Sequence, residues 1–153
     1  MYKRYKKKKA TTKDNLNVDG AVQKPANKGK YGARKVEYKD GLKFDSSMEF
    51  SYYLELLSQK EKGEVLEIEL QPVFILQEKF RYKDKAIRDI KYKSDFKVTY
   101  ADGSIIIIDI KGMPPTPEFK LKWKMVKFLN QDIDFRCIKS VGKKPYTWET
   151  LKI

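Results

Sequence analysis

The clearest pattern in the chain is a run of isoleucines that ends in charged residues. Residues 105–108 are four consecutive isoleucines, followed by Asp109, Ile110, Lys111 and Gly112. Such a run is typical of a strand that is buried on both faces of a covered sheet. Residues two apart share one face of a strand, so Asp109 and Lys111 should point to the same side. Charged side chains at the end of a buried strand need a partner or a chemical role.

The segment before this strand alternates between apolar and charged residues, which predicts a half-buried partner strand over 90–100. Residues 101–103, which end in glycine, favour a three-residue hairpin loop with the glycine in the left-handed conformation. That loop places Asp95 opposite Asp109 on the neighbouring strand. A two-residue loop would place Asp95 opposite Ile110 instead, and a slip of one residue would reverse the faces. The three-residue loop is the register that we predict.

Two segments have the periodicity of helices that cover a sheet. Ser46 followed by Glu49 is a capping-box pattern that opens the first helix. Apolar residues then recur at i, i+3, i+4 and i+7, namely Phe50, Tyr53, Leu54 and Leu57. Thr116 is expected to cap the second helix, which has Pro117 at its first position and runs to residue 130. This helix has a broad apolar face, made of Phe119, Leu121, Trp123, Met125, Val126, Phe128 and Leu129.

The remaining patterns complete an α/β domain. The other expected elements, in chain order, are a hairpin around residues 40–41, a strand over 65–70, a second strand over 73–76 after a bend at Pro72, a charged hairpin over 77–89 and a strand over 133–139. The order of helix, antiparallel strands, helix and strand predicts a mixed β-sheet flanked by helices on both faces.

The charge of the chain is concentrated at its N-terminal end. The net charge is +13, and residues 1–39 hold 13 Lys and Arg against 3 Asp and Glu. We predict that residues 1–29 form a disordered basic arm, because they carry too little apolar surface to offset the entropy of ordering. Lys6, Lys7, Lys8 and Lys9 would then contact nucleic-acid phosphates. A solubilising tail is the alternative, and residues 30–153 form the folded domain in either case.

The composition excludes several kinds of chemistry. The chain has no histidine, which removes Ser-His and Cys-His catalysis and histidine-ligated zinc. Its single cysteine, Cys137, excludes an internal disulfide and lies in a predicted strand, so we expect a buried thiol. No segment is apolar enough for a signal peptide or a membrane span, and we expect no membrane association. Catalysis has to rely on carboxylates, lysines, tyrosines or a metal bound through oxygen.

Four charged residues form the candidate active site: Glu49, Asp95, Asp109 and Lys111. Carboxylates from neighbouring strands and from a helix are the ligands that Mg²⁺ prefers. A lysine beside the metal can position water or stabilise charge on a phosphate, which amounts to phosphodiester hydrolysis without histidine. Each member also has a simpler interpretation. Glu49 could only cap its helix, Asp95 could be a solvated strand residue, and Asp109 with Lys111 could be a structural ion pair.

This set of residues resembles the PD-(D/E)XK nuclease superfamily. The superfamily pattern is an acidic residue, a turn and then (D/E)-x-K at the end of a hydrophobic strand, often with a glutamate on the preceding helix. Ser94-Asp95 stands here where that pattern has Pro-Asp, and residues 109–111 match its second part. The chain is also similar to a family of small phage and prophage proteins assigned to this superfamily. The matching stretches are residues 30–32, 44–49, 71–74, 94–96, 109–113 and 119–122.

The resemblance implies a restriction-endonuclease-like fold and DNA cleavage that depends on Mg²⁺ or Mn²⁺. It implies that Glu49, Asp95 and Asp109 bind the metal and that Lys111 positions the water or the phosphate. Gln71 is a weaker candidate for support of the site, with a strand-end amide as the alternative.

The resemblance also leads us to expect a phage or prophage endonuclease in the bacterial cytoplasm. Branched DNA, such as a Holliday junction, is the leading substrate, and symmetrical cutting of a junction would need a homodimer. The lysines of the second helix, Lys120, Lys122 and Lys124, either follow a DNA phosphate path or form a solvated helix face. The alternative function is a DNA- or RNA-binding protein without catalysis.

Overall fold

The computed structural model describes residues 16–17, 21–22 and 35–153. The chain divides into two compact units, Met1–Ser47 and Met48–Ile153. The first unit contains a four-stranded sheet made of β1 (Leu16–Asn17), β2 (Ala21–Val22), β3 (Val36–Glu37) and β4 (Lys43–Phe44). β3 and β4 form the hairpin predicted around residues 40–41, with a 3-10 helix, η1 (Lys39–Gly41), at the turn.

The predicted disordered arm is only partly within the described residues. β1 and β2 fall inside it, and their four residues pair with one another. The other residues of the arm lie outside the described residues, among them Lys6, Lys7, Lys8 and Lys9. For them the disordered, phosphate-binding arm stays a prediction.

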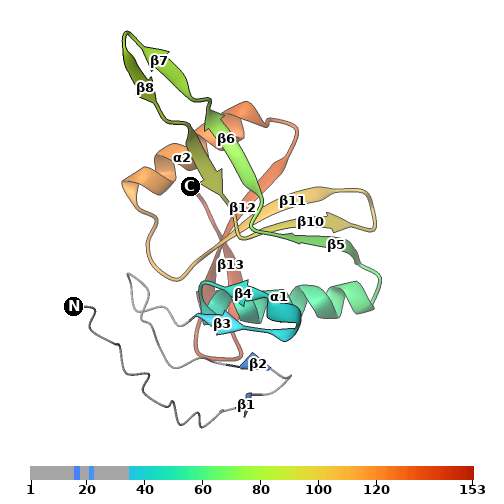
Figure 1. The fold of residues 1–153 in the computed structure, drawn as a ribbon. Helices are drawn as coiled ribbons and strands as arrows, with labels where there is room; N and C mark the ends of the chain where they lie inside the picture. Colours follow the sequence, from blue (N-terminus) through green and yellow to red (C-terminus); the bar gives the residue numbers. More distant parts are fainter. Residues whose placement is uncertain (1–15, 18–20, 23–34) are drawn as a thin grey trace, which may run out of the picture. The chain divides into compact units, whose positions relative to one another are not determined.

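The second unit is built on a mixed sheet of five strands in the order β13-β12-β11-β10-β5 (Figure 1). The strands are β5 (Val65–Leu70), β10 (Phe96–Tyr100), β11 (Ile105–Lys111), β12 (Asp134–Val141) and β13 (Thr147–Leu151). β11 runs parallel to β12, and the other neighbouring pairs are antiparallel. This arrangement confirms the α/β class and the mixed sheet. The isoleucine strand β11 lies at its centre and is buried from Ile106 to Ile110.

The register between β10 and β11 is the one that the three-residue loop predicts. Phe96 lies opposite Ile108, and the ladder continues to the loop without a slip. Gly103 has a φ of +84°, the left-handed conformation that such a loop requires. One step beyond Phe96 and Ile108, this register brings Asp95 and Asp109 opposite each other.

The first long helix, α1 (Ser47–Glu61), begins directly after Ser46. The rings of Tyr52 and Tyr53 contact Phe96, with centroids 5.9 and 6.4 Å apart, so α1 covers the face of the sheet on which Phe96 lies. The predicted apolar stripe was partly wrong. Leu56, which it omitted, is fully buried, whereas Tyr53, Leu54 and Leu57 are only half-buried.

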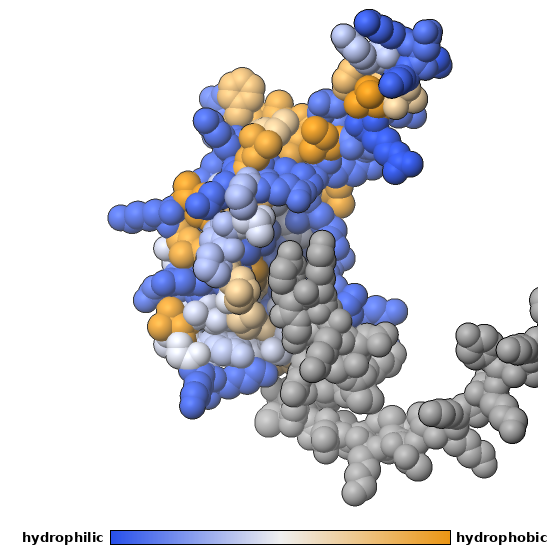
Figure 2. Space-filling view, turned by 90° about the vertical axis from the view of Figure 1, so that its left-hand side faces the viewer, coloured by the Kyte–Doolittle hydropathy of each residue, from blue (hydrophilic) through white to orange (hydrophobic). Residues whose placement is uncertain are grey.

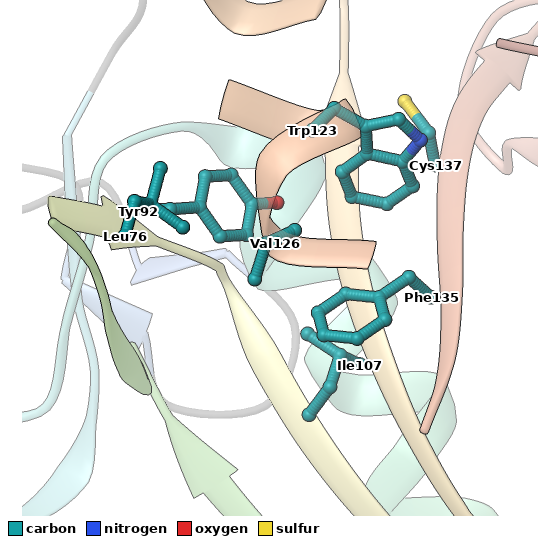
Figure 3. Close-up of a cluster of buried hydrophobic side chains, with 7 residues drawn as sticks. All are labelled: Leu76, Tyr92, Ile107, Trp123, Val126, Phe135 and Cys137. Atoms are coloured by element: carbon teal, nitrogen blue, oxygen red, sulfur yellow. The ribbon is translucent and has the colours of Figure 1, made fainter. Parts of the chain in front are cut away.

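The second helix, α2 (Pro117–Leu129), covers the opposite face. Thr116 caps it as predicted, because its Oγ1 accepts a hydrogen bond from the N–H of Phe119 at 3.2 Å. Its buried residues pack with strand residues in one apolar cluster, made of Leu76, Tyr92, Ile107, Trp123, Val126, Phe135 and Cys137 (Figure 3). The predicted apolar face of this helix was too broad, since Leu121, Phe128 and Leu129 are exposed. The buried thiol of Cys137 is confirmed.

Within the described part of the chain, neither α1 nor α2 is long and apolar enough to cross a membrane.

A bent ribbon of two strands leaves the central sheet. β5 continues as β6 (Val73–Gln77), and β10 is preceded by β9 (Ile90–Lys93), which pairs with β6. Both segments bend at the same level of the ribbon, at residues 71–72 between β5 and β6 and at residues 94–95 between β9 and β10. The bend predicted at Pro72 is therefore a joint bend of two paired strands.

The ribbon ends in a hairpin of β7 (Phe80–Tyr82) and β8 (Lys85–Ile87). This hairpin is the charged connection predicted over 77–89. Figure 1 shows it projecting from the rest of the second unit.

Candidate active site

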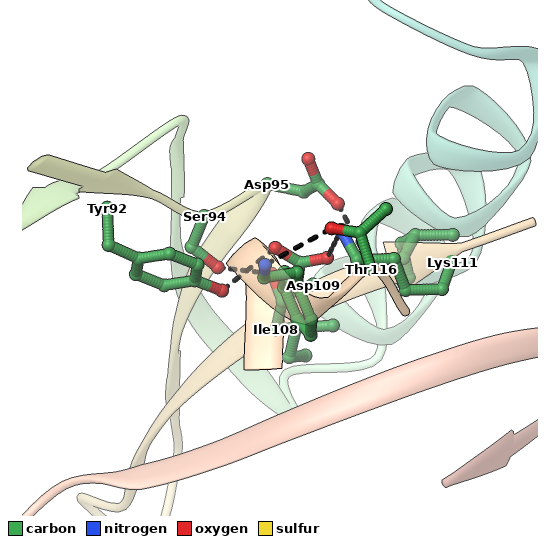
Figure 4. Close-up of polar contacts among 9 residues, drawn as sticks. Tyr92, Ser94, Asp95, Ile108, Asp109, Lys111 and Thr116 are labelled. Carbon is green, nitrogen blue, oxygen red and sulfur yellow. Dashed lines mark hydrogen bonds and ion pairs between the residues drawn. The ribbon is translucent and has the colours of Figure 1, made fainter. Parts of the chain in front are cut away.

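Asp109 is the most buried acid of the candidate site, with only 2% of its surface exposed. The hydroxyl of Tyr92 donates a hydrogen bond to Oδ2 at 2.8 Å, and the ammonium of Lys111 forms an ion pair with Oδ1 (Figure 4). Burial raises the pKa of Asp109, while the positive charge of Lys111 and the Tyr92 hydroxyl lower it. Lys111 is the only described group that Oδ1 faces, and a carboxylate oxygen has a second lone pair with which it can coordinate a cation.

Asp95 lies at the bend of the ribbon, one residue before β10 begins. Its Oδ2 accepts a hydrogen bond from the N–H of Ile110 at 2.6 Å. Burial holds the pKa of Asp95 well above its usual value, and the negative charges of Asp109 and Glu49 raise it further. Two facing carboxylates in a poorly solvated place repel each other, so the site favours either a bound proton or a bound cation.

The backbone around the bend fixes the direction of Asp95. Ser94 is fully buried, and its hydroxyl donates to the carbonyl oxygen of Ile108 at 2.7 Å. Gln71 has a φ of +54°, and its N–H donates to the carbonyl oxygen of Asp95 at 2.8 Å. The left-handed conformation costs a residue other than glycine about 1 kcal/mol, and such strain is concentrated at functional sites. Gln71 therefore contacts Asp95 through its backbone, and a supporting role for its side-chain amide stays a prediction.

Glu49 lies in the first turn of α1, beside the end of β11. The side chain of the preceding residue, Met48, occupies the space that a Cβ on Gly112 would need. The hydroxyl of Ser140 also contacts the sulfur of Met48, at 3.1 Å. Glu49 is thus close enough for its charge to raise the pKa of Asp95. In the part of the chain that the structure describes, however, no three acidic or cysteine side chains form a group that could hold a metal ion.

Two aromatic residues complete the surroundings of Lys111 and Asp109. The ammonium of Lys111 lies 4.1 Å from the centre of the Phe119 ring, a cation–π contact that limits the directions it can take. In the sequence, Phe119 and Tyr92 look like ordinary apolar positions, and neither contact was predicted. The only available signal was a tyrosine at an inward position of the strand before Asp95, because a buried tyrosine hydroxyl needs a partner.

A cleft of about 360 Å³ opens at this cluster. Two acids, Asp109 and Glu118, line it together with four lysines, Lys91, Lys93, Lys111 and Lys122. Of the three helix lysines predicted to contact DNA, only Lys122 lines the cleft, and it forms an ion pair with Glu118 at 2.9 Å. Lys120 and Lys124 are exposed on α2 outside this lining. A cleft with this excess of lysines suits an anionic group such as a phosphate.

The fold and the cluster define an α/β protein whose central strand ends in a buried acid–lysine pair. The chain belongs to the family described as "Protein of unknown function (DUF1064)", whose model matches residues 28–144. This range contains all four residues of the candidate site and both long helices. No curated protein and no solved structure matches the chain.

Proposed function

We propose that this protein is a metal-dependent endodeoxyribonuclease that hydrolyses DNA phosphodiester bonds. The observation that carries the proposal is the pair of Asp109 and Lys111, which lines a cleft together with three more lysines and has Asp95 beside it on the neighbouring strand. Phosphodiester hydrolysis needs charge stabilisation on the phosphate next to a site that activates water. The resemblance to PD-(D/E)XK nucleases supports the same assignment.

Asp95 and Asp109 would hold the divalent cation, Mg²⁺ or Mn²⁺, and Glu49 would add a third carboxylate or only its negative charge. Carboxylate oxygens are the donors that these cations prefer. A carboxylate oxygen has two lone pairs, so Oδ1 of Asp109 can face Lys111 and also coordinate a cation. A cation would also relieve the charge repulsion that helps to raise the pKa of Asp95. When bound, the metal polarises a phosphoryl oxygen and lowers the pKa of a water molecule.

Lys111 would neutralise the phosphate or hold the attacking water. It lines the cleft, and its ammonium is held by Asp109 on one side and by the ring of Phe119 on the other. Tyr92 donates to Oδ2 of Asp109 and so keeps this carboxylate in one orientation. Lys91, Lys93 and Lys122 would attract the DNA backbone to the cleft.

Branched DNA, such as a Holliday junction, is the substrate that we propose, in recombination or replication of a phage or prophage in the bacterial cytoplasm. The support is the resemblance described above. Symmetrical cutting of a four-way junction would require two active sites, so we propose a homodimer. Lys6, Lys7, Lys8 and Lys9 would add affinity that weakens with salt.

A DNA- or RNA-binding protein without catalysis is the second candidate. It is favoured by one observation: no three carboxylates of the described residues form a group that could hold a metal ion. In that case the pair of Asp109 and Lys111 would be structural, and the lysines of the cleft would only bind phosphate.

The substitution Asp109→Asn separates the two candidates, because it removes the charge and keeps the size of the side chain. Cleavage of linear, single-stranded, flap and four-way-junction DNA is measured with Mg²⁺ or Mn²⁺, and binding is measured separately without metal. We expect cleavage to fall about 100-fold or more, since a metal ligand contributes several kcal/mol to the transition state. Binding of DNA should be retained.

The matched control is Asp132→Asn, the same chemical change at an exposed position after α2. It should leave both activities unchanged. Undiminished cleavage by Asp109→Asn would rule out the nuclease assignment. Absence of cleavage in the wild-type protein on every substrate, with binding present, would favour the second candidate.

A further inference from the structure

The β7–β8 hairpin makes no contribution to the buried apolar cluster of the second unit. All of its residues are exposed, and none belongs to the buried apolar cluster. A two-stranded hairpin is at best marginally stable in water, and this one extends the β6–β9 ribbon into solvent (Figure 1). Its side chains are therefore available to a partner.

One face of the hairpin is apolar. Phe80 and Tyr82 are two residues apart on β7, so they share a face, and Ile87 lies opposite Phe80. Phe80 is 46% exposed and Tyr82 is 61% exposed. Figure 2 shows hydrophilic side chains at the tip of this projection and hydrophobic ones below them. Exposed apolar side chains that lie together and are rimmed by charged ones mark a candidate binding surface.

The hairpin and its connections are also basic. Residues 78–91 contain six Lys and Arg against three Asp and Glu. Lys83 forms the tip with a φ of +52°, a conformation that costs a lysine about 1 kcal/mol and suits glycine or asparagine better. Its ammonium lies 5.6 Å from the centre of the Tyr82 ring. Positive charge at a strained tip beside an exposed aromatic ring fits an anionic partner that also offers flat apolar surfaces.

The hairpin is continuous with the candidate active site. β8 leads through a short connection into β9, where Lys91 and Lys93 line the cleft and Tyr92 donates to Asp109. A strand rises about 3.3 Å per residue, so the five residues from Ile87 to Tyr92 span roughly 17 Å. DNA that enters the cleft at Asp109 would therefore extend to the hairpin within a few nucleotides.

We propose that the β7–β8 hairpin is a DNA-binding arm whose aromatic face stacks on unpaired bases next to the cleavage site. This inference rests on the proposed function for the identity of the substrate, and it defines the substrate class as DNA with unpaired bases at a branch or gap. Aromatic side chains bind single-stranded nucleic acid by stacking on base faces, while lysine and arginine follow the phosphates.

Two other partners, duplex DNA and a second copy of this chain, fit the hairpin less well than DNA with unpaired bases. In a continuous duplex the base faces are already stacked, and the grooves present polar edges rather than flat apolar surfaces. A second copy of this chain would bring an equally basic hairpin, and the two would repel each other. DNA with exposed bases matches both the aromatic face and the positive charge.

The test compares binding of a gapped four-way junction with binding of an unbroken duplex of equal length, by the full chain without divalent metal. We expect Tyr82→Ala to weaken binding to the gapped junction about 10-fold and to leave duplex binding unchanged. The triple variant Arg81→Gln, Lys83→Gln and Lys85→Gln should weaken binding to both DNAs and make binding less dependent on salt. A matched control, Lys60→Gln with Lys62→Gln and Lys152→Gln, removes three exposed charges elsewhere and should change neither.

A second variant shows whether the effect of Tyr82→Ala comes from the lost side chain or from local misfolding of the hairpin. Gln77 and Ile90 pair at the end of the β6–β9 ladder, so residues 78–89 can be replaced by the two-residue turn Asn-Gly. This variant should melt like the wild type and should lose the preference for the gapped junction. Unchanged preference in this variant and in Tyr82→Ala would overturn the proposal. A change of the sedimentation mass from dimer to monomer would also overturn it, because the hairpin would then be a contact between subunits.

Hydrolysis of a small phosphodiester, the p-nitrophenyl ester of thymidine monophosphate, distinguishes this proposal from the nuclease assignment. The hairpin variants should hydrolyse it with Mn²⁺ at the wild-type rate. If the wild type hydrolyses no phosphodiester but the hairpin determines the preference for gapped DNA, the nuclease assignment fails and the hairpin proposal stands. If hydrolysis occurs and the hairpin variants bind both DNAs like the wild type, the nuclease assignment stands and the hairpin proposal fails.

Discussion

The end of β11 and the β7–β8 hairpin both combine charged residues with aromatic rings, but in opposite environments. At the end of β11, Asp109 is buried and each of its oxygens faces a defined group, Tyr92 or Lys111. In the hairpin, Arg81 and its neighbours are exposed. A buried charge interacts strongly with a few neighbours, whereas exposed charges are screened by water and salt. Single substitutions should therefore act strongly at the first place and weakly at the second.

The largest effect is expected from Lys111→Met, which leaves Asp109 as a buried charge without its ion-pair partner. The free energy of unfolding at pH 8 should fall by about 2 kcal/mol, somewhat less than for a fully buried pair because Lys111 is partly exposed. Adding Asp109→Asn to the same chain should restore most of the loss. Urea unfolding of the two single variants and the double variant measures this coupling.

The matched control is Lys122→Met, since Lys122 is about as exposed as Lys111 but has the largely exposed Glu118 as its ion-pair partner. Its cost should stay below about 1 kcal/mol. If the double variant is no more stable than Lys111→Met, the buried charge of Asp109 is not the cause of the loss.

An intermediate effect, of opposite sign, is expected from Asp95→Asn. The pKa of Asp95 is raised in the folded protein, so between its ordinary value and the raised one the folded state binds more protons than the unfolded state. Stability should therefore fall as the pH rises through this window. Asn cannot ionise, and its amide oxygen can still accept the hydrogen bond from Ile110. The variant should be more stable than the wild type at pH 8, with no advantage below about pH 4.

Thermal unfolding from pH 4 to pH 8 without divalent metal checks this prediction, and Asp132→Asn provides the comparison. Mg²⁺ or Mn²⁺ should raise the melting temperature of the wild type at pH 8 and have less effect on Asp95→Asn, because the variant lacks one of the proposed ligands. A variant that is less stable than the wild type at pH 8 would contradict the assigned cause of the pKa shift.

The smallest effect is expected from Arg81→Gln in the hairpin. It should change the free energy of unfolding by less than about 0.5 kcal/mol, as is usual for an exposed position. Its affinity for DNA should fall only a few-fold, because one phosphate contact among several is lost. Urea unfolding and a DNA titration at two salt concentrations measure both. A loss of stability as large as that of Lys111→Met would remove the contrast between the two regions.

The local pattern of the chain was sufficient for much of the fold and for part of the site. The glycine of the 101–103 loop favoured the three-residue loop, whose register faces Asp95 with Asp109, over the two-residue alternative. Thr116 and Pro117 defined the start of α2 in the same way. Both features depend on neighbours in sequence, which is why spacing alone could predict them.

The packing of each helix could not be predicted in the same detail. Leu54 and Leu57 fit the helical period of α1 as well as Leu56 does, yet Leu56 is the fully buried one. Leu121 and Phe128 of α2 looked equally fit for the core and are exposed. Periodicity describes a broad apolar sector, and the angle at which the helix lies on the sheet selects the part of it that is buried.

The sequence by itself determined that Asp95, Asp109 and Lys111 meet at the end of the isoleucine strand, because strand period and loop length set this over a few residues. Only the tertiary structure determined which aromatic residues contact Asp109 and Lys111 there. The joint bend of β5–β6 and β9–β10 brings Tyr92 to Asp109, and the seating of α2 brings Phe119 to Lys111. The bend also directs the basic hairpin away from the sheet. These contacts join elements far apart in the chain, so they depend on long-range packing that no local pattern encodes.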